Sequence, residues 1–281
     1  MTAIINYKDC TMTFSEKLKR IWAANDSLVC VGLDPDIKKL PECVKASYYP
    51  IFDFNKALID ATHDLVCCYK PQIAYYAGQN AEEQLQMTMD YLREKYPEIP
   101  VILDSKRSDI GSTAEMYAKE AFDRYKADAV TVNPFMGEDS MKPFLDRADK
   151  GVVILCRTSN PGSKEIQELE SGGRKLYEII AGYAVTKWNY NKNVLLVIGA
   201  TCPDELGEVR RIAGNTVFLV PGVGAQGGDV QKVLEKGKTP DGRGLIINSS
   251  RAIIYASSGN DFADAARNAA SELKDTINQY R

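Results

Sequence analysis

This sequence of 281 residues has very little histidine and no CxxC motif. His63 is its one histidine, and none of its seven cysteines belongs to a CxxC motif, which argues against a structural zinc site. Four cysteines (Cys30, Cys67, Cys68 and Cys156) lie inside apolar runs, where a reduced thiol packs as a small hydrophobic side chain. We therefore expect reduced cysteines and a reducing, cytoplasmic location.

The sequence also has no long apolar run and no excess of positive charge, and nothing in it suggests secretion. No run approaches the ~20 residues of a membrane-spanning helix, and residues 1–20 contain no apolar stretch followed by a small-residue cleavage site. A net charge of −3 excludes a broadly basic nucleic-acid-binding surface but leaves room for a local basic pocket. We therefore expect a globular protein with neither a membrane nor a nucleic acid polymer as partner.

Short apolar runs alternate with longer stretches of helical periodicity through most of the chain. Runs rich in valine, isoleucine and leucine are what parallel strands buried on both faces require. Here they cover residues 28–33, 65–70, 100–104, 128–132, 151–156, 194–198, 216–220 and 244–247. Helical periodicity covers residues 14–25, 52–63, 82–95, 112–126, 140–146, 173–187, 205–213, 229–236 and 261–279.

This order of elements predicts an α/β fold, a single (β/α)₈ (TIM) barrel. Eight strand–helix repeats exceed the roughly five or six strands usual in an open doubly wound sheet. About 250 residues is a common length for such a barrel. No change of composition and no Pro/Gly-rich linker marks a domain boundary. We therefore expect one domain over residues 1–281, with residues 1–27 as an N-terminal helical segment that covers the bottom of the barrel.

Polar and charged residues follow the predicted strands. Active sites of TIM barrels lie at the C-terminal ends of the strands. In this chain the positions there include Asp34, Lys70, Asp104, Lys106, Asn133, Arg157, Ser159, Thr201 and Asn248. A barrel with a purely structural role would have no need of such residues, so we expect an active site at this end.

The segment DSKRSDIGST after the third predicted strand is the sharpest signal. At strand spacing the side chains of Asp104 and Lys106 point to the same side and enter the barrel mouth. The structural alternative is a salt bridge at a strand end followed by a helix N-cap from Asp109 or Ser112. Lys70, at the end of the second strand, favours a functional site, because two lysines and two aspartates can then alternate in one cavity.

Glycines and an arginine follow the last two predicted strands. The stretch PGVGAQGG begins at Pro221 and includes Gln226, and NSSR, ending at Arg251, follows the eighth strand. In TIM barrels these two loops frequently bind phosphate through backbone N–H groups and a helix N-terminus, and arginine can hold phosphate oxygens by two hydrogen bonds. A glycine-rich stretch alone is more simply a flexible turn, but Arg251 after the next strand favours phosphate binding.

These motifs resemble those of the orotidine 5′-phosphate decarboxylase family, in its longer bacterial-type subgroup. The resemblance rests on DSKRSDIGST, LDP, YKPQIAYY, RTSNPGS and both phosphate loops, which occur in order between Leu33 and Arg251. It implies decarboxylation of orotidine 5′-phosphate to uridine 5′-phosphate without metal or cofactor, the last step of de novo pyrimidine nucleotide synthesis. Departures are modest: Asn160 stands where compact relatives often have histidine, and residues 38–50 and 165–174 form longer stretches.

The resemblance implies a role for each residue of the charged motif. Lys106 would donate the proton to C6 of the pyrimidine, the carbon that carbon dioxide leaves. Asp104 would lie against the scissile carboxylate, and Lys70 would link this network to the ribose. Asp109 would belong to the same catalytic set.

It also implies the residues that bind the rest of the nucleotide. Asp34 would hold the ribose hydroxyls, and Ser159 the pyrimidine amide. Gln226 and Arg251 would hold the phosphate, with Pro221 also in contact with the substrate.

A homodimer is a further implication of the resemblance. Asp109, Ile110 and Thr113 would reach the active site of the neighbouring subunit, so that each site would be shared across the interface.

Other enzymes fit parts of the pattern. A Mg²⁺-dependent sugar-phosphate decarboxylase or synthase of the same superfamily would share the Asp-x-Lys-x-x-Asp motif, but such relatives carry an acidic residue where this chain has Lys70. A cation there opposes a divalent metal. A Schiff-base aldolase with Lys106 or Lys70 as nucleophile is disfavoured, because nearby carboxylates keep either lysine protonated. A non-catalytic nucleotide-binding barrel would not need the intact charged set.

Overall fold

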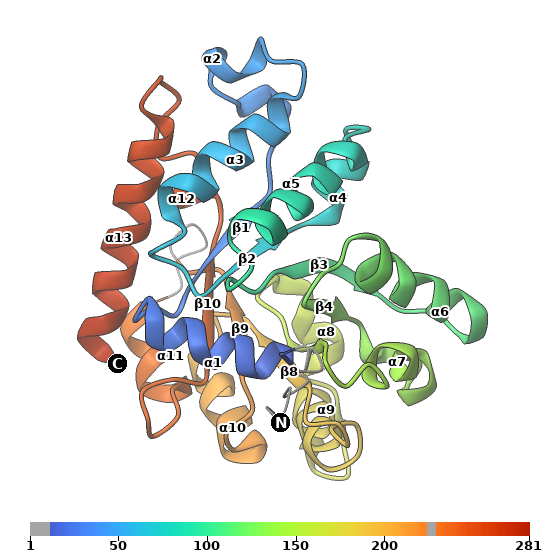
Figure 1. Cartoon of the computed structure of the whole chain (residues 1–281). Coiled ribbons are helices and arrows are strands. Elements are labelled where there is room, and N and C mark those ends of the chain that lie inside the picture. Colours follow the sequence, from blue (N-terminus) through green and yellow to red (C-terminus); the bar gives the residue numbers. More distant parts are fainter. Residues whose placement is uncertain (1–11, 224–228) are drawn as a thin grey trace, which may run out of the picture.

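The computed structural model describes residues 12–223 and 229–281, in which eight parallel strands form a nearly closed barrel (Figure 1). The strands are β1 (Val29–Leu33), β2 (Cys68–Pro71), β3 (Ile102–Arg107), β4 (Ala129–Val132), β5 (Gly151–Arg157), β8 (Val194–Ile198), β9 (Phe218–Pro221) and β10 (Leu245–Ser249). They pair in the order β2-β1-β10-β9-β8-β5-β4-β3. Isolated parallel bridges, Tyr69 with Val101 and Gln72 with Asp104, link β2 to β3. The predicted TIM barrel is confirmed.

Most of the barrel strands are largely apolar because both of their faces are covered; the main exception is β3, which ends in Asp-Ser-Lys-Arg. Every residue of β1, β4, β8 and β10 is buried. Their inner faces fill the barrel and their outer faces meet the helices, so the alternating pattern of a half-exposed strand is not required. This explains why continuous apolar runs identified the strands.

Helices follow the strands and cover the outside of the barrel. The longer ones are α3 (Pro50–Thr62), α5 (Glu82–Lys95), α6 (Gly111–Lys119), α7 (Glu138–Leu145), α9 (Leu176–Thr186), α10 (Pro203–Ala213), α11 (Val230–Gly237) and α13 (Phe262–Tyr280). Short helices are η1 (Ile37–Lys39), α2 (Glu42–Lys45), α4 (Ile73–Ala77), η2 (Glu120–Arg124), η3 (Pro134–Met136), η4 (Pro161–Ser163), α8 (Lys164–Gln167) and α12 (Arg251–Ile254). Within the described ranges, no helix has the length and apolar character that crossing a membrane requires.

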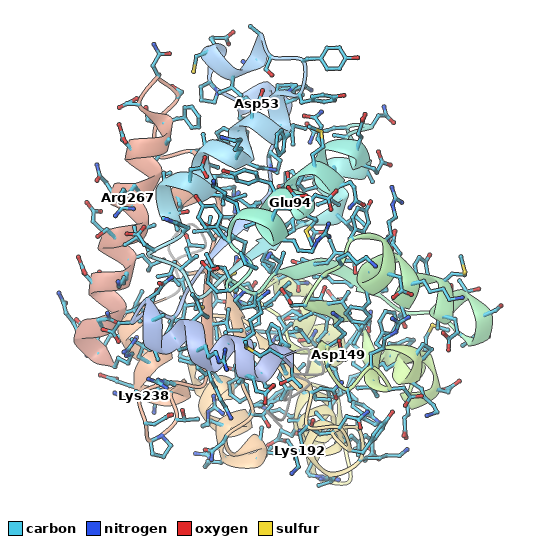
Figure 2. The ribbon with its side chains drawn as sticks, in the orientation of Figure 1. Asp53, Glu94, Asp149, Lys192, Lys238 and Arg267 are labelled. Carbon is cyan, nitrogen blue, oxygen red and sulfur yellow. The ribbon has the colours of Figure 1, made fainter. Side chains whose placement is uncertain are left out.

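Helix α1 (Phe14–Ala24) lies across the end of the barrel where the strands begin (Figure 1). The Phe14 N–H donates to the carbonyl of Asp149, 2.9 Å away, and Figure 2 shows Asp149 beside the start of this helix. Lys17 Nζ lies 2.8 Å from Oδ2 of Asp128, which directly precedes β4. The helix thus covers the bottom of the barrel and leaves the opposite end to the βα loops.

Two predicted helices differ from those observed. The predicted helix 112–126 is helical through Arg124, but it changes type: α6 ends at Lys119 and a π-helical turn, η2, follows directly, beside the two 3.0 Å hydrogen bonds that Arg107 donates to Glu120. The predicted helix 173–187 begins too early. An antiparallel pair, β6 (Glu170–Ser171) and β7 (Arg174–Lys175), precedes it, and both glycines of its turn have the positive φ that such a two-residue turn requires.

Candidate active site

A cavity of about 340 Å³ lies at the C-terminal ends of the barrel strands. Its walls come from the ends of β1, β2, β3, β9 and β10 and from the residues that follow them. Five predicted site residues line it: Asp34, Lys70, Asp104, Pro221 and Arg251. Polar residues from distant parts of the sequence therefore meet where the fold predicts an active site.

Asp104, which lines this cavity, lies between two lysines: Lys70 also lines the cavity, whereas Lys106 does not. Lys70 Nζ is 3.0 Å from Asp104 Oδ2, and Lys106 Nζ is 2.6 Å from Asp104 Oδ1. The Lys70 and Asp104 side chains are only 4% and 10% exposed, whereas that of Lys106 is 45% exposed. One ammonium is thus fixed in the interior, while the side chain that carries the other is partly exposed to solvent.

Mutual attraction keeps the buried groups charged. Burial by itself would raise the pKa of Asp104, but Lys70 and Lys106 hold that pKa below its usual value. Burial would likewise lower the pKa of Lys70, but attraction from Asp104 and then Asp34 raises it above its usual value. At neutral pH the site therefore contains a carboxylate and an ammonium that cannot easily change charge.

Lys106 reaches Asp104 through an irregularity in β3. The spacing argument requires a regular strand, but φ of Lys106 is +49° and the register between β3 and β4 shifts after Leu103. Both side chains still converge, because the bulge and not strand alternation directs Lys106. Thr131 of β4, which the sequence motifs do not single out, donates to Asp104 Oδ1 at 2.8 Å. Its only signal in the sequence is a single hydroxyl in the apolar run AVTV.

Asp34 follows β1 and lines the cavity. Its Oδ1 is buried and has no hydrogen-bond partner among residues 12–223 and 229–281. The strand comes close to the loop after β10, since a Cβ added to Gly32 would lie 1.8 Å from Ser250 Oγ. A side chain at position 32 would push apart the loops that carry Asp34 and Arg251.

The phosphate end of the predicted site is partly described. Pro221 ends β9 and Gly222, at φ +95°, turns the chain directly after it. Arg251 begins α12 and lines the cavity from the β10 side. Gln226 lies outside the described residues.

Asp109, Ile110 and Thr113 do not line this cavity in their own chain. They lie between the end of β3 and the first turn of α6, where the Ile110 side chain is 56% exposed. The structural alternative for this segment, a helix N-cap from Asp109 or Ser112, is wrong: Ile110 occupies the N-cap position without a side-chain bond, and Asp109 Oδ1 accepts from the Ile110 N–H at 2.8 Å.

Ser159 lies on the loop after β5 and packs against the loop after β8. A Cβ added to Gly199 would be 2.7 Å from the Cβ of Ser159, and Thr201 Oγ1 donates to the Ser159 carbonyl at 3.4 Å. Ser159 thus lies at the same end of the barrel as the 340 Å³ cavity but is not among the residues that line it.

Metal-binding side chains do not gather in the parts of the chain that the structure describes. These contain no group of three or more histidine, cysteine, aspartate or glutamate side chains arranged to hold a metal ion. At the cavity itself the side chain beside Asp104 is the Lys70 ammonium, which repels a cation.

Comparisons with known proteins point to one family. Residues 27–267 match the sequence model of the Orotidine 5′-phosphate decarboxylase / HUMPS family. The chain is 56% identical over 270 residues to the orotidine 5′-phosphate decarboxylase of Ralstonia pickettii, an alignment that covers 96% of this chain and 100% of that one. The solved structure of Leishmania donovani OMP decarboxylase is 39% identical with a TM-score of 0.83, covering 96% and 98% of the two chains. That of Leishmania donovani UMP synthase is 41% identical with a TM-score of 0.85, covering 96% of this chain and 57% of that one. This chain therefore belongs to the orotidine 5′-phosphate decarboxylase / HUMPS family.

Proposed function

We propose that this enzyme decarboxylates orotidine 5′-phosphate to uridine 5′-phosphate without a metal or cofactor, and that Lys106 supplies the proton. The observation that carries the proposal is the Lys70–Asp104–Lys106 network, in which Lys70 and Asp104 line the cavity and Lys106 joins them through its ion pair with Asp104. The names of the similar proteins, orotidine 5′-phosphate decarboxylases over nearly their full length, support the substrate.

The chemistry follows from the charges in this network. When the C6–carboxylate bond breaks, its electron pair stays on C6 and carbon dioxide leaves. A fixed ammonium beside C6 stabilises this developing negative charge. Lys106, as the more exposed of the two lysines, then transfers a proton from Nζ to C6 and completes the product. Asp104, ionised beside the substrate carboxylate, destabilises the bound substrate relative to the transition state.

The remaining cavity residues fit the other parts of the nucleotide. The buried, unpaired Oδ1 of Asp34 accepts a hydrogen bond from a ribose hydroxyl, because a buried acceptor without a partner is costly. Arg251 binds the phosphate at the mouth of the cavity, together with Gln226, and Ser159 binds the pyrimidine amide. Binding energy from the distant phosphate is then available for the reacting end of the substrate.

We also propose a homodimer in which Asp109, Ile110 and Thr113 complete the site of the partner subunit. Large apolar side chains are exposed on and near this segment, including Ile110, Met116, Phe135 at 81% and Met136. Helices α6 and α7 stand at the edge of the molecule in Figure 1. An exposed group of this kind marks an interaction surface, and its position explains why these residues miss the cavity of their own chain.

The test is loss of the orotate chromophore when purified, EDTA-treated protein is mixed with orotidine 5′-phosphate. We expect full turnover after chelation and none from Lys106→Ala. Activity that appears only when Mg²⁺ is restored would instead favour the sugar-phosphate enzymes of the same superfamily, and an inactive wild-type chain would favour a non-catalytic barrel.

A further inference from the structure

Three residues of β3 lie opposite a single residue of β4. Leu103 pairs with Val130 and Arg107 pairs with Val132, so residues 104–106 bulge out opposite Thr131. In such a bulge the extra residues lose their ladder hydrogen bonds. Backbone N–H groups that lose their ladder partners need other acceptors, and those of Ser105 and Lys106 are in this position.

The Thr131 hydroxyl provides those replacements. It accepts hydrogen bonds from the backbone N–H groups of Ser105 and Lys106, at 3.0 and 2.9 Å. It donates its own proton to Asp104 Oδ1 at 2.8 Å. A hydroxyl has one proton and two lone pairs, so all of its hydrogen-bonding capacity is directed at this bulge. Thr131 is 1% exposed, so its hydroxyl is shielded from water even though Ser105 and Lys106 are themselves only partly buried or exposed.

The bulge holds Lys106 in a conformation that it would not adopt by itself. Its φ of +49° is in the left-handed region, which is unfavourable for a side chain without a local polar group and persists only where its surroundings impose it. The Lys106 N–H bond to Thr131 is such a constraint. The same hydroxyl donates to Asp104 Oδ1, the oxygen that lies 2.6 Å from Lys106 Nζ. Thr131 Oγ1 therefore contacts the Lys106 backbone directly and the Lys106 ammonium through Asp104.

We propose that Thr131 is a positioning residue for the reaction, whose hydroxyl fixes the Lys106 backbone and the Asp104 carboxylate in one arrangement. The inference rests on the proposed function, in which Lys106 delivers the proton. Thr131 acts through these two residues and has no assigned contact with substrate. A reacting group displaced by about 1 Å can lose on the order of 10²-fold in rate, so the consequence is expected in kcat.

Two substitutions separate the hydroxyl from the shape of the side chain. Thr131→Val keeps the branched shape but removes the hydroxyl, whereas Thr131→Ser keeps the hydroxyl but removes the methyl group. Thr62→Val is the matched control: Thr62 is fully buried, its hydroxyl donates to the Leu58 carbonyl at 2.7 Å and lies 2.9 Å from the Tyr69 hydroxyl, and neither Thr62 nor Tyr69 lines the cavity. All variants are assayed for kcat, KM and uridine 5′-phosphate binding, and the Thr131→Val protein is crystallised.

We expect Thr131→Val to lower kcat by about 10- to 100-fold while product affinity stays within about threefold, and Thr131→Ser to retain most of the wild-type kcat. Thr62→Val should lose stability without losing kcat. In the Thr131→Val crystal structure, Lys106 should leave the left-handed region or its Nζ should leave Asp104 Oδ1. A Val variant with near wild-type kcat, a Ser variant as impaired as Val, or an unchanged bulge overturns the proposal.

Failure of the proposed function and failure of the proposed role of Thr131 give different experimental results. A wild-type chain that does not decarboxylate orotidine 5′-phosphate refutes that function, whatever Thr131 does. The conformation of Lys106 in the Thr131→Val crystal structure still decides whether the hydroxyl positions the bulge. If Val at 131 does not fold, the Ser variant decides: full kcat supports the hydroxyl, and a loss of kcat assigns the methyl group a packing role.

Discussion

Lys70 and Asp104 form an ion pair of 3.0 Å in which both side chains are nearly inaccessible to solvent. Neither charge can be removed alone without leaving the other buried and uncompensated, a change that typically destabilises a protein by about 3–5 kcal/mol. The pair is therefore both part of the site and part of the stability of the barrel mouth.

Asp104→Asn should lower the free energy of unfolding at neutral pH by about 3–5 kcal/mol, because Lys70 is left buried without its main partner. The pKa of Asp104 is lowered in the folded chain by the two lysines. Its contribution to stability is thus present above the ordinary carboxyl pKa of about 4 and is lost as the pH falls below it. Urea unfolding of wild type and variant from about pH 7 to about pH 3 should show the difference between them narrowing below pH ~4.

Glu42→Gln is the control for this experiment, because it removes an exposed ion pair with Lys45 and should change stability by at most about 1 kcal/mol. An Asp104→Asn protein as stable as the control, or a difference that stays constant with pH, would contradict the buried-pair interpretation.

Arg251→Ala should weaken binding of uridine 5′-phosphate and leave binding of uridine nearly unchanged. A charge-assisted contact to phosphate is worth roughly 2–4 kcal/mol, or about 30- to 1,000-fold in affinity. Calorimetric titration with both ligands measures it, and Arg211→Ala, exposed on α10, is the matched control. Equal weakening of nucleotide and nucleoside would show that Arg251 does not bind the phosphate.

Arg157 anchors the loop that carries Ser159. Its buried guanidinium lies 2.7 Å from Glu168 and 3.3 Å from Glu205 and also donates to the Thr158 carbonyl. Arg157→Ala should destabilise the protein by about 2–3 kcal/mol, somewhat less than a fully buried pair because both glutamates are partly exposed. It should also raise KM, since the Ser159 loop loses its support.

Thermal unfolding and steady-state kinetics test this, with Arg147→Ala as the control because Arg147 pairs with the more exposed Asp123. A stability loss without any change in KM would mean that Arg157 supports the fold alone.

The barrel and much of its site are predictable from the sequence because the local sequence of each strand shows that the strand is buried and which polar residues follow it. Continuous apolar runs locate the barrel strands, and the polar residues that follow them identify Asp34, Lys70, Asp104 and Arg251 as neighbours. These inferences need only the rule that the carboxyl ends of parallel strands meet at one end of a barrel.

Features that depend on the pairing of two strands could not be predicted from the sequence. The bulge at Lys106 depends on the register between β3 and β4, and the importance of Thr131 depends on that bulge, so neither is visible in the local pattern of one strand. The π-helical turn after α6 coincides with hydrogen bonds from Arg107 to Glu120 across 13 positions. The proposed roles of Asp109 and Thr113 involve a second chain, which no single-chain cavity displays.

The shared active site can be tested by mixing two inactive proteins. Lys106→Ala and Asp109→Ala should each be nearly inactive as homodimers if every site takes Lys106 from one subunit and Asp109 from the other. In a heterodimer one site then receives both lesions and the other receives neither, because a two-fold interface contains two identical composite sites. Complete exchange of equal amounts makes about half of the dimers heterodimers, so roughly a quarter of wild-type activity should return.

Mixing Lys106→Ala with Asp104→Ala is the matched control, because both residues belong to the same network in one chain. In that heterodimer each site carries one lesion and no activity should return. If the first mixture stays as inactive as this control although subunit exchange is verified by mass spectrometry, Asp109 acts within its own chain. The exposed position of Ile110 and the absence of this segment from its own cavity favour the opposite result.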